Sequence, residues 1–368
     1  MKQLKAFVSG NVSFRLFYQS KASLQQLPEA FKDHAAPPID GIGVAPVCGW
    51  TEGMRTMGTE FKDEYCVSGR YVCAALVQAE RKIPAVLLDV KCQAEYEVEK
   101  QARGVEHLPK MVRSEIKERI SEQLKPSMPP SISGITVVAD REEGRVFASC
   151  MSDAQIDALS NYINIALEQR PVLMTPETAA ITAGINPAEL ECCSFSPDLS
   201  VEPPAESSLG MDFLTWLWFN WDVNGAVQEV GGHDLFSYML AGPVSFYREG
   251  EGAHEALLRK GAPLGCREAA AALMAGKKIK KVKFVLAHGD KVFSATVDDS
   301  FAFRSVKLPK IEAFGCGGLF AERMRLLQLF VNDWFLLYNR FLSLRGAGGT
   351  WMMSVEQMRT WITRMSEK

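Results

Sequence analysis

The chain has 368 residues, of which 47% are hydrophobic and 23% are charged, the composition of a folded globular protein. This length allows one large domain or two to three smaller ones, each with its own core. The most apolar stretch, Phe213–Trp221, is far too short to cross a bilayer as a helix, and Met1–Lys21 holds no apolar run of signal-peptide length. We therefore expect a cytoplasmic protein with no membrane partner.

The charge of the chain is unevenly distributed, although its net value is only −3. Leu257–Lys310 holds 12 basic and 4 acidic residues, a net charge of +8. Ile185–Ala256, which precedes it, holds 1 basic and 12 acidic residues, a net charge of −11. Such a protein can still present a strongly positive face, and that face is what a polyanion encounters.

The nine cysteines are irregularly spaced and form no Cys-x-x-Cys pair. An odd count without that spacing predicts reduced, buried thiols rather than a disulfide framework or a zinc site. The five histidines are scattered, and the sequence lacks the Gly-x-x-x-x-Gly-Lys-Ser/Thr motif of phosphate-binding loops. We therefore predict neither a metal nor another cofactor.

The first elements along the chain are a mixture of strands and helices. Alternating or continuous apolar residues predict strands at Ser13–Tyr18 and Tyr71–Gln78. Pro37–Met57 is rich in glycine and proline, which predicts a loop. Helix-forming residues predict helices at Ala94–Gln101 and Pro109–Leu124, within a helical subregion of about residues 94–125.

The second of these helices carries an apolar stripe and a basic stripe. The apolar stripe recurs every four residues and is expected to be buried. The basic stripe falls at i, i+3 and i+7, so its side chains share one exposed face that could contact phosphates. Alternatively, these basic side chains only pair with nearby Glu106, Glu115 and Glu118. The apolar residues are Val112, Ile116, Ile120 and Leu124, and the basic residues are Lys110, Arg113 and Lys117.

A hairpin and a capped helix complete the first region. The prolines of Lys125–Gly134 exclude a helix interior and predict a loop. Strands at Ile135–Asp140 and Arg145–Cys150 are joined by a short polar turn that ends in glycine, a strong hairpin signal. Ser152 and Gln155 form a capping box that opens the next helix. This order of elements predicts an α+β fold in which hairpins pack against helices.

The middle of the chain is expected to be an acidic, aromatic-rich connecting region, residues 185–256, between a first region, 1–184, and a last region, 257–368. Polar and proline-rich breaks in Cys192–Glu206 predict a linker. The aromatic run Leu209–Trp221 could stack on bases, but its acidic surroundings would repel phosphate. Core packing or a dimer contact is therefore the favoured interpretation.

The last region begins with the basic segment and is expected to end in long helices. A short alanine-rich helix at Arg267–Ala275 is followed by a second predicted hairpin, formed by Lys281–Ala287 and Lys291–Val297. Alternation along its first strand places apolar side chains on one face, with Lys281 and Lys283 on the other.

Five lysines crowd into the seven residues that open this hairpin. We interpret them as point charges that contact phosphates and release counterions, the part of DNA affinity that does not depend on sequence. The alternative is a solvated strand edge, on which lysines discourage pairing with other strands. Two basic residues nearby favour the DNA interpretation. The predicted DNA-binding residues of this segment are Lys277, Lys278, Lys280, Lys281, Lys283, Arg259 and Lys260.

A series of short motifs occurs in a definite order along the chain. The first half contains Gly49-Trp50, Arg81-Lys82-Ile83-Pro84, Glu115-Ile116-Lys117, the hairpin Val137–Asp140 with Gly144–Cys150, and the helix Ser152–Leu167. The second half contains Glu268–Met274, Ala275-Gly276-Lys277-Lys278 and the strand pair Lys281–Ala287 and Lys291–Val297. In this order and spacing the chain resembles the recombination-associated RdgC family over about Met1–Pro176 and Leu257–Leu344. Cys192–Ala256 departs from the family, with only a loose match at Leu214-Thr215-Trp216.

The resemblance implies a fold of two related α/β halves that assembles as a ring-shaped homodimer. Family members are similar in having a positively charged central hole that encircles duplex DNA with little sequence preference. They are thought to restrain the recombinase RecA by occupying DNA. The expected protein is therefore a nucleoid-associated, non-enzymatic DNA-binding protein that modulates recombination.

Two other hypotheses remain open from the sequence. One is a metal-dependent exonuclease that would use Asp140, Asp298 and Asp299, although a two-metal site needs several converging carboxylates. Aspartate at strand ends also commonly marks a turn. The other is a protein-interaction module without a DNA role, which would use the acidic aromatic segment 192–256.

Overall fold

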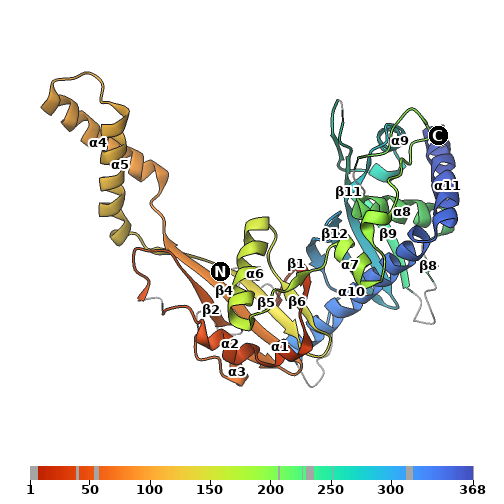
Figure 1. The fold of residues 1–368 in the computed structure, drawn as a ribbon, viewed down its shortest axis with the longest axis horizontal. Helices are drawn as coiled ribbons and strands as arrows, with labels where there is room; N and C mark the ends of the chain where they lie inside the picture. The colour runs from red at the N-terminus through yellow and green to blue at the C-terminus, as the bar shows by residue number, and fades with distance from the viewer. Residues whose placement is uncertain are drawn as a thin grey trace.

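The computed structural model describes residues 7–38, 41–53, 58–205, 208–225, 227–228, 236–250, 252–311 and 318–367. Over these residues the chain forms a mixed α+β structure around one antiparallel sheet, with two helices projecting at one end (Figure 1). The α+β class expected from the sequence is confirmed. None of the described helices is long and apolar enough to cross a membrane.

The sheet contains 13 strands among the described residues. Its main order is β10-β9-β11-β12-β13-β1-β6-β5-β4-β2, with β3 paired to β4, β7 to β1 and β8 to β9. The strands are β1 (Val12–Tyr18), β2 (Val47–Glu52), β3 (Val67–Ser68), β4 (Tyr71–Arg81), β5 (Pro130–Asp140), β6 (Arg145–Ala148), β7 (Val172–Leu173), β8 (Val227–Gln228), β9 (Phe236–Tyr247), β10 (Glu255–Leu258), β11 (Lys278–His288), β12 (Lys291–Asp298) and β13 (Phe303–Lys307).

The helices lie between and after these strands. They are α1 (Lys21–Gln25), α2 (Leu27–Asp33), α3 (Asp63–Cys66), α4 (Ala85–Arg103), α5 (Lys110–Leu124), α6 (Asp153–Leu167), α7 (Pro176–Thr182), α8 (Leu209–Asn224), α9 (Arg267–Met274), α10 (Gly318–Arg345) and α11 (Gly348–Ser366). The expected capping box is present at the start of α6, where Ser152 and Gln155 each satisfy a backbone N–H of the other.

Strand β1 divides the sheet, because it pairs with β6 on one side and β13 on the other. We call β1, β6, β5, β4 and β2 the first half of the sheet, and β13, β12, β11, β9 and β10 the second half. The first half is covered on both faces. Leu27, Leu159 and Ile163 of α2 and α6 pack on one face, and Tyr71 and Cys73 of β4 join the main core on the other.

The second half of the sheet is covered on one face. Helices α8 and α10 bury aromatic side chains against it, and Trp334 of α10 lies 5.1 Å from Phe284 of β11 between ring centroids. Helix α11 packs on α8 and α10 through its own aromatic side chains. Helix α8 is apolar around its circumference, which is typical of a helix enclosed by other elements. Figure 1 shows α8 and α11 on the side of β11 that faces away from the projecting helices.

Helices α4 and α5 form an antiparallel pair that projects from β4 and β5, and we call residues 85–124 the arm (Figure 1). The apolar stripe predicted for the second helix is buried in a small core of its own, with Ile116 and Ile120 at its centre against Cys92 and Leu108. Helix α4 begins nine residues before the predicted Ala94, immediately after Pro84. Proline before the first turn suits a helix start, because that position needs no backbone N–H.

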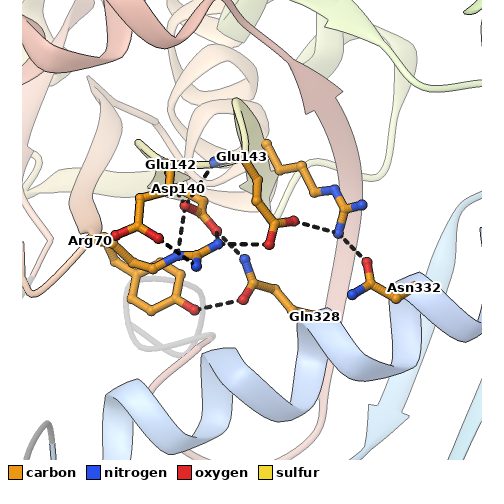
Figure 2. A network of polar contacts seen from close by, with 8 residues as sticks. Arg70, Asp140, Glu142, Glu143, Gln328 and Asn332 are labelled. Atoms are coloured by element: carbon orange, nitrogen blue, oxygen red, sulfur yellow. Dashed lines mark hydrogen bonds and ion pairs between the residues drawn. The ribbon is translucent and has the colours of Figure 1, made fainter. Parts of the chain in front are cut away.

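A polar network joins the first half of the sheet to α10 (Figure 2). Asp140 is fully buried at the end of β5 and accepts hydrogen bonds from Arg70 and Gln328. Gln328 in turn accepts a hydrogen bond from the Tyr71 hydroxyl at 2.9 Å. The hydrogen bond to Asp140 raises the pKa of Arg70, and burial raises the pKa of Tyr71 to about 12.

The same network continues along α10. Asn332, one turn after Gln328, accepts a hydrogen bond from Arg145 of β6 at 2.5 Å. Arg145 also lies 3.0 Å from Glu143, whose carboxylate pairs with Arg70 at 2.8 Å. Two residues of one helix are therefore fixed to the turn between β5 and β6, which holds α10 against the first half of the sheet.

Several expectations about local structure were wrong. Pro37–Met57 is not a loop throughout, because β2 occupies Val47–Glu52, and a Cβ at Gly49 would lie 2.6 Å from the Ala36 Cα atom. Lys125–Gly134 is likewise not all loop, since β5 begins at Pro130, where a proline can open a strand. The middle region contributes α8 and β9 to the second half of the sheet, so it does not act as a separate connection.

The expectation of buried thiols is met in part, because Cys48, Cys192 and Cys266 are only half-buried. The cysteines of the described residues are all free, and Cys66, Cys73, Cys92, Cys150 and Cys193 are buried. Burial raises the pKa of the Cys73 and Cys150 thiols, which keeps them protonated at neutral pH. Cys316 lies outside the described residues.

Candidate nucleic-acid interface

Strand β11 carries the predicted alternation. Val282, Phe284 and Leu286 are buried against the helices, while Lys281 and Lys283 point to the other side. The prediction for these two faces is confirmed. It placed the lysines correctly because the side chains of a strand alternate with a period of two.

The uncovered face of the second half of the sheet gathers basic and hydroxyl side chains from three strands. Lys283 pairs across the sheet with Thr296 of β12, which pairs with Arg304 of β13. In the next row, Ser294 of β12 pairs with Lys307 of β13. We call this surface the open face, and define it by Lys281, Lys283, Ser294, Thr296, Arg304 and Lys307.

The open face is electrically one-sided. Lys281, Lys283 and Lys307 make no ion pair within the described residues. The acid beside them is Asp298, whose carboxylate lies 3.4 Å from Arg304. That carboxylate also accepts hydrogen bonds from the turn that follows β12, including the Ser300 hydroxyl at 2.8 Å. The four basic groups of the open face therefore lie beside a carboxylate that is already bound.

Sequence reasoning missed Arg304 and Lys307 as site residues, because it did not predict β13. The strand is only five residues long, and its register shifts between Ser294 and Thr296 of the neighbouring strand. Ser305 adopts a positive φ of 51°, which interrupts the alternation. The remaining signal was the short run Phe303-Arg304-Ser305-Val306-Lys307, in which the two basic residues lie three apart.

Lys278 is a wrong prediction as a DNA-contacting residue. It is 4% exposed, and its ammonium group pairs with the buried carboxylate of Asp212 on α8. Arg345 of α10 lies on the other side of that carboxylate at 3.8 Å, and the Lys278 ammonium stands 4.6 Å from the ring centroid of Phe195. Lys278 therefore belongs to the core, because β11 begins three residues before the predicted strand and Lys278, four residues before Val282, falls on the same buried side.

The other predicted lysines of this cluster are partly engaged. Lys280 holds its ammonium 4.1 Å from the ring centroid of Tyr247, a cation–π contact. Lys277 lies at the start of the strand and lines a polar pocket together with Arg248 and Glu202. Neither lysine lies on the open face as defined, so the cluster of five is divided among four environments.

The remaining predicted basic residues lie away from the open face. Arg259 and Lys260 are exposed on the loop after β10, the edge strand of the second half. Lys110, Arg113 and Lys117 are exposed on α5, and the suggested pairing with Glu106, Glu115 or Glu118 is not formed within the described residues. Figure 1 places the arm and the second half of the sheet at opposite ends of the molecule.

The carboxylates suggested for a nuclease have separate structural roles in the fold. Asp140 belongs to the polar network that joins the first half of the sheet to α10, which we call the junction network. Asp298 accepts hydrogen bonds from the turn after β12. Burial, followed by the neighbouring Asp298, raises the pKa of Asp299. In the ranges that the structure describes, no three His, Cys, Asp or Glu side chains come together as a metal site.

The aromatic run in the middle of the chain is part of the core, as favoured from the sequence. Phe213, Trp216 and Trp218 of α8 are buried, and Phe213 stacks edge-on with Tyr338 of α10 at 4.9 Å. These rings are therefore not available to a protein partner or to bases, which removes the aromatic part of the interaction-module hypothesis.

Comparisons with known proteins supply no assignment for this chain. No family model matches the sequence, and no curated protein matches it either. We therefore infer the function from the geometry and charge of the open face.

Proposed function

We propose that the protein binds duplex DNA without sequence specificity, using the open face of the second half of the sheet as a phosphate-binding surface. The observation that carries this proposal is the row Lys283–Thr296–Arg304, flanked by Lys281 and Lys307. Basic groups without an ion-pair partner contribute most to the free energy of binding, because each contact with a phosphate releases counterions condensed on DNA.

The side chains of the open face suit the DNA backbone better than base edges. Lysine is a mobile point charge, and the hydroxyls of Ser294 and Thr296 can donate to phosphate oxygens. Contacts of these kinds position a duplex but carry no sequence information directly. Sequence-tolerant binding with a steep salt dependence follows from this chemistry.

The proposal includes a homodimer, for which the arm supplies support. Along α4, Val86, Val90 and Val98 are 75%, 61% and 63% exposed, and Ala94 completes their four-residue spacing. Such an apolar stripe on the face opposite the arm's own core would be buried by a second copy of the arm. Two chains joined in this way would present two open faces to one duplex. By the resemblance to the RdgC family, the role extends to a ring that limits access of the recombinase RecA to DNA.

The DNA proposal is tested with fluorescence anisotropy on a labelled duplex of random sequence at several salt concentrations. The double variant Lys281→Glu/Lys283→Glu should bind at least about tenfold more weakly, and its salt slope should fall by about 1.8, since each phosphate contact contributes about 0.9. The control Lys21→Glu/Lys32→Glu places the same charges on exposed helix positions of the first half and should bind like the parent. Equal losses in both variants would overturn the assignment to the open face. A gel of the same samples with Mg²⁺ should show intact DNA, whereas shortened DNA would favour the exonuclease hypothesis.

The dimer is tested separately by sedimentation velocity. Val90→Lys places a charge in the middle of the apolar stripe and should shift the protein toward monomer. Ile181→Lys is a matched control, because Ile181 is also an exposed apolar residue but lies on α7. A parent protein that is monomeric at all concentrations would refute the dimer while leaving the open face untouched.

A further inference from the structure

The distal end of the arm carries a pocket of about 300 Å³. Its lining residues come from α4, from the connecting loop and from the first turn of α5. Figure 1 shows this loop at the end of the arm that is farther from the sheet. Leu108 is buried in the small core of the arm and gives the pocket a fixed apolar side. The lining residues are Gln93, Tyr96, Lys100, His107, Leu108 and Arg113.

The pocket is lined by groups that favour an anion, with no carboxylate among the lining residues. Arg113 is exposed, and its guanidinium makes no hydrogen bond or ion pair within the described residues. His107, also exposed, has no partner there either. Lys100 donates to Glu97 at 2.8 Å, which partly neutralises it. The net charge presented to a ligand is therefore positive.

A contact between the two helices holds the backbone beside the pocket in place. The Tyr96 hydroxyl of α4 donates to the Arg113 carbonyl oxygen of α5 at 3.1 Å. This bond ties α4 to the first turn of α5, so the backbone that carries the Arg113 side chain stays beside Tyr96. The Tyr96 ring also offers a flat apolar surface beside the basic groups.

We propose that this pocket binds a phosphate monoester. Arginine, lysine and histidine side chains that line one small space can donate to the oxygens of a phosphate, and arginine is the side chain best suited to contact two of them. A volume of about 300 Å³ accepts the ester together with a small attached group such as a nucleoside. The ligand has two possible sources, a free mononucleotide or the terminal phosphate of a nucleic-acid strand.

The site is distinct from the open face and from the rest of the basic stripe on α5. Lys110 and Lys117 do not line the pocket, although they share the stripe with Arg113. A duplex lying on a surface presents diester phosphates, which do not enter a pocket of this kind. The proposal therefore does not depend on duplex binding by the open face.

The test is a calorimetric titration of the full chain with adenosine 5′-monophosphate and with adenosine. The monophosphate should bind with a Kd of about 1 mM or tighter, whereas adenosine should not bind. Arg113→Gln removes the positive charge and the guanidinium fork and should weaken binding of the monophosphate at least about tenfold. His107→Gln replaces the imidazole by a neutral amide and should weaken it about threefold. Both positions are exposed, so the variants should fold, and their unfolding temperatures check this point.

Lys117→Gln is the matched control, because it removes one exposed charge of the same helix outside the pocket. It should bind the monophosphate like the parent, and so should the Lys281→Glu/Lys283→Glu variant. Equal binding of adenosine, unchanged binding in Arg113→Gln, or an equal loss in Lys117→Gln would each overturn the proposal.

The source of the phosphate is then resolved with a short labelled strand carrying either a 5′-phosphate or a 5′-hydroxyl. Tighter binding of the phosphorylated strand, lost in Arg113→Gln, would identify strand ends as the source. Equal binding of the two strands, with the mononucleotide still bound, would identify a free nucleotide. Absence of binding by mononucleotide and phosphorylated strand alike would refute the site, whatever the outcome for duplex DNA.

Discussion

The two halves of the sheet differ in how they are covered. In the first half, β4 buries almost every side chain from Tyr71 to Val77, because α2 and α6 lie on one face and the main core on the other. In the second half, β11 alternates between buried apolar residues and solvent-facing lysines. A continuous apolar run is typical of a strand between two layers, and alternation is typical of a strand with one face in water.

This difference teaches that alternation, rather than lysine density, marks the candidate functional surface. Lys278 and Lys281 are three residues apart in the densest basic stretch of the chain. One is paired with Asp212 in the core, and the other lies on the open face without an ion pair among the described residues. Arg304 and Lys307 lie outside that stretch, yet the sheet brings them onto the same surface.

The sharpest test of the contrast within β11 compares its buried and exposed lysines. Lys278→Ala should lower the free energy of unfolding by about 4 kcal/mol, because it leaves the buried Asp212 carboxylate without its closer cation and with Arg345 at 3.8 Å. Lys281→Ala should change the unfolding free energy by less than about 0.5 kcal/mol. Urea unfolding of both variants measures these values. Similar small effects would show that Lys278 is not held in the core.

The covering of the two halves is compared directly by truncating one side chain in each. Leu159 of α6 is fully buried on the first half, and Leu159→Ala should cost about 3 kcal/mol of unfolding free energy. Val285 belongs to the uncovered side of β11, and Val285→Ala should cost less than about 1 kcal/mol. Comparable losses measured by urea unfolding would mean that another layer covers the second half in solution.

Local patterns predicted much of the fold. Both hairpins, the capping box of α6 and the buried stripe of α5 follow from signals confined to a few neighbouring residues. The joining of the two halves through β1 could not be predicted, because its pairing with β13 connects residues nearly 300 positions apart. Similarly, only the fold shows that α8 and β9 complete the second half.

The candidate site was predictable only in part, for physical reasons. Alternation identified Lys281 and Lys283, but the predicted strand began at Lys281, so the sequence analysis did not place Lys278 in β11 on the same side as Val282. The short β13, with its register shift and its positive φ at Ser305, obscured Arg304 and Lys307, because such an irregularity has no strong sequence signal.

Breaking the junction network should lower stability by less than the two changes above. It tests the contact between α10 and the first half of the sheet, rather than the packing within either half. Gln328→Leu removes the donor to Asp140 and the acceptor of the Tyr71 hydroxyl, and should cost about 2 kcal/mol of unfolding free energy. Gln123→Leu on α5, an exposed position of the arm, is the control and should be nearly neutral. Thermal unfolding of both variants gives the comparison, and a neutral Gln328→Leu would refute a stabilising role for the network.

The polarity of the open face is tested by adding one acid at its centre. Thr296→Glu should weaken duplex binding about tenfold, equivalent to about 1.4 kcal/mol, because a carboxylate would lie between Lys283 and Arg304. Thr296→Gln has nearly the same size without the charge and should bind within about twofold of the parent. Anisotropy on the duplex measures both, and equal losses would indicate that shape rather than charge is being changed.

The smallest expected effect is a loss of stability at alkaline pH that originates at the junction. The pKa of Tyr71 is raised to about 12 by burial, whereas an exposed tyrosine has a pKa of about 10. Below pH 10 the hydroxyl is protonated in both the folded and the unfolded chain, so this group adds no pH dependence. As the pH rises from about 10 to 12, the unfolded chain releases the proton first, and the free energy of unfolding should fall by about 1 kcal/mol at pH 11.

Urea unfolding between pH 9 and 11 measures this decline. Tyr71→Phe removes the titrating group, so its stability should decline less steeply over the same range. Parallel curves would mean that burial does not raise the pKa of Tyr71, which would contradict the packing of α10 against the first half of the sheet. A shallower curve for Tyr71→Phe alone would place part of the alkaline sensitivity at the contact that joins the covered half of the sheet to the half with the open face.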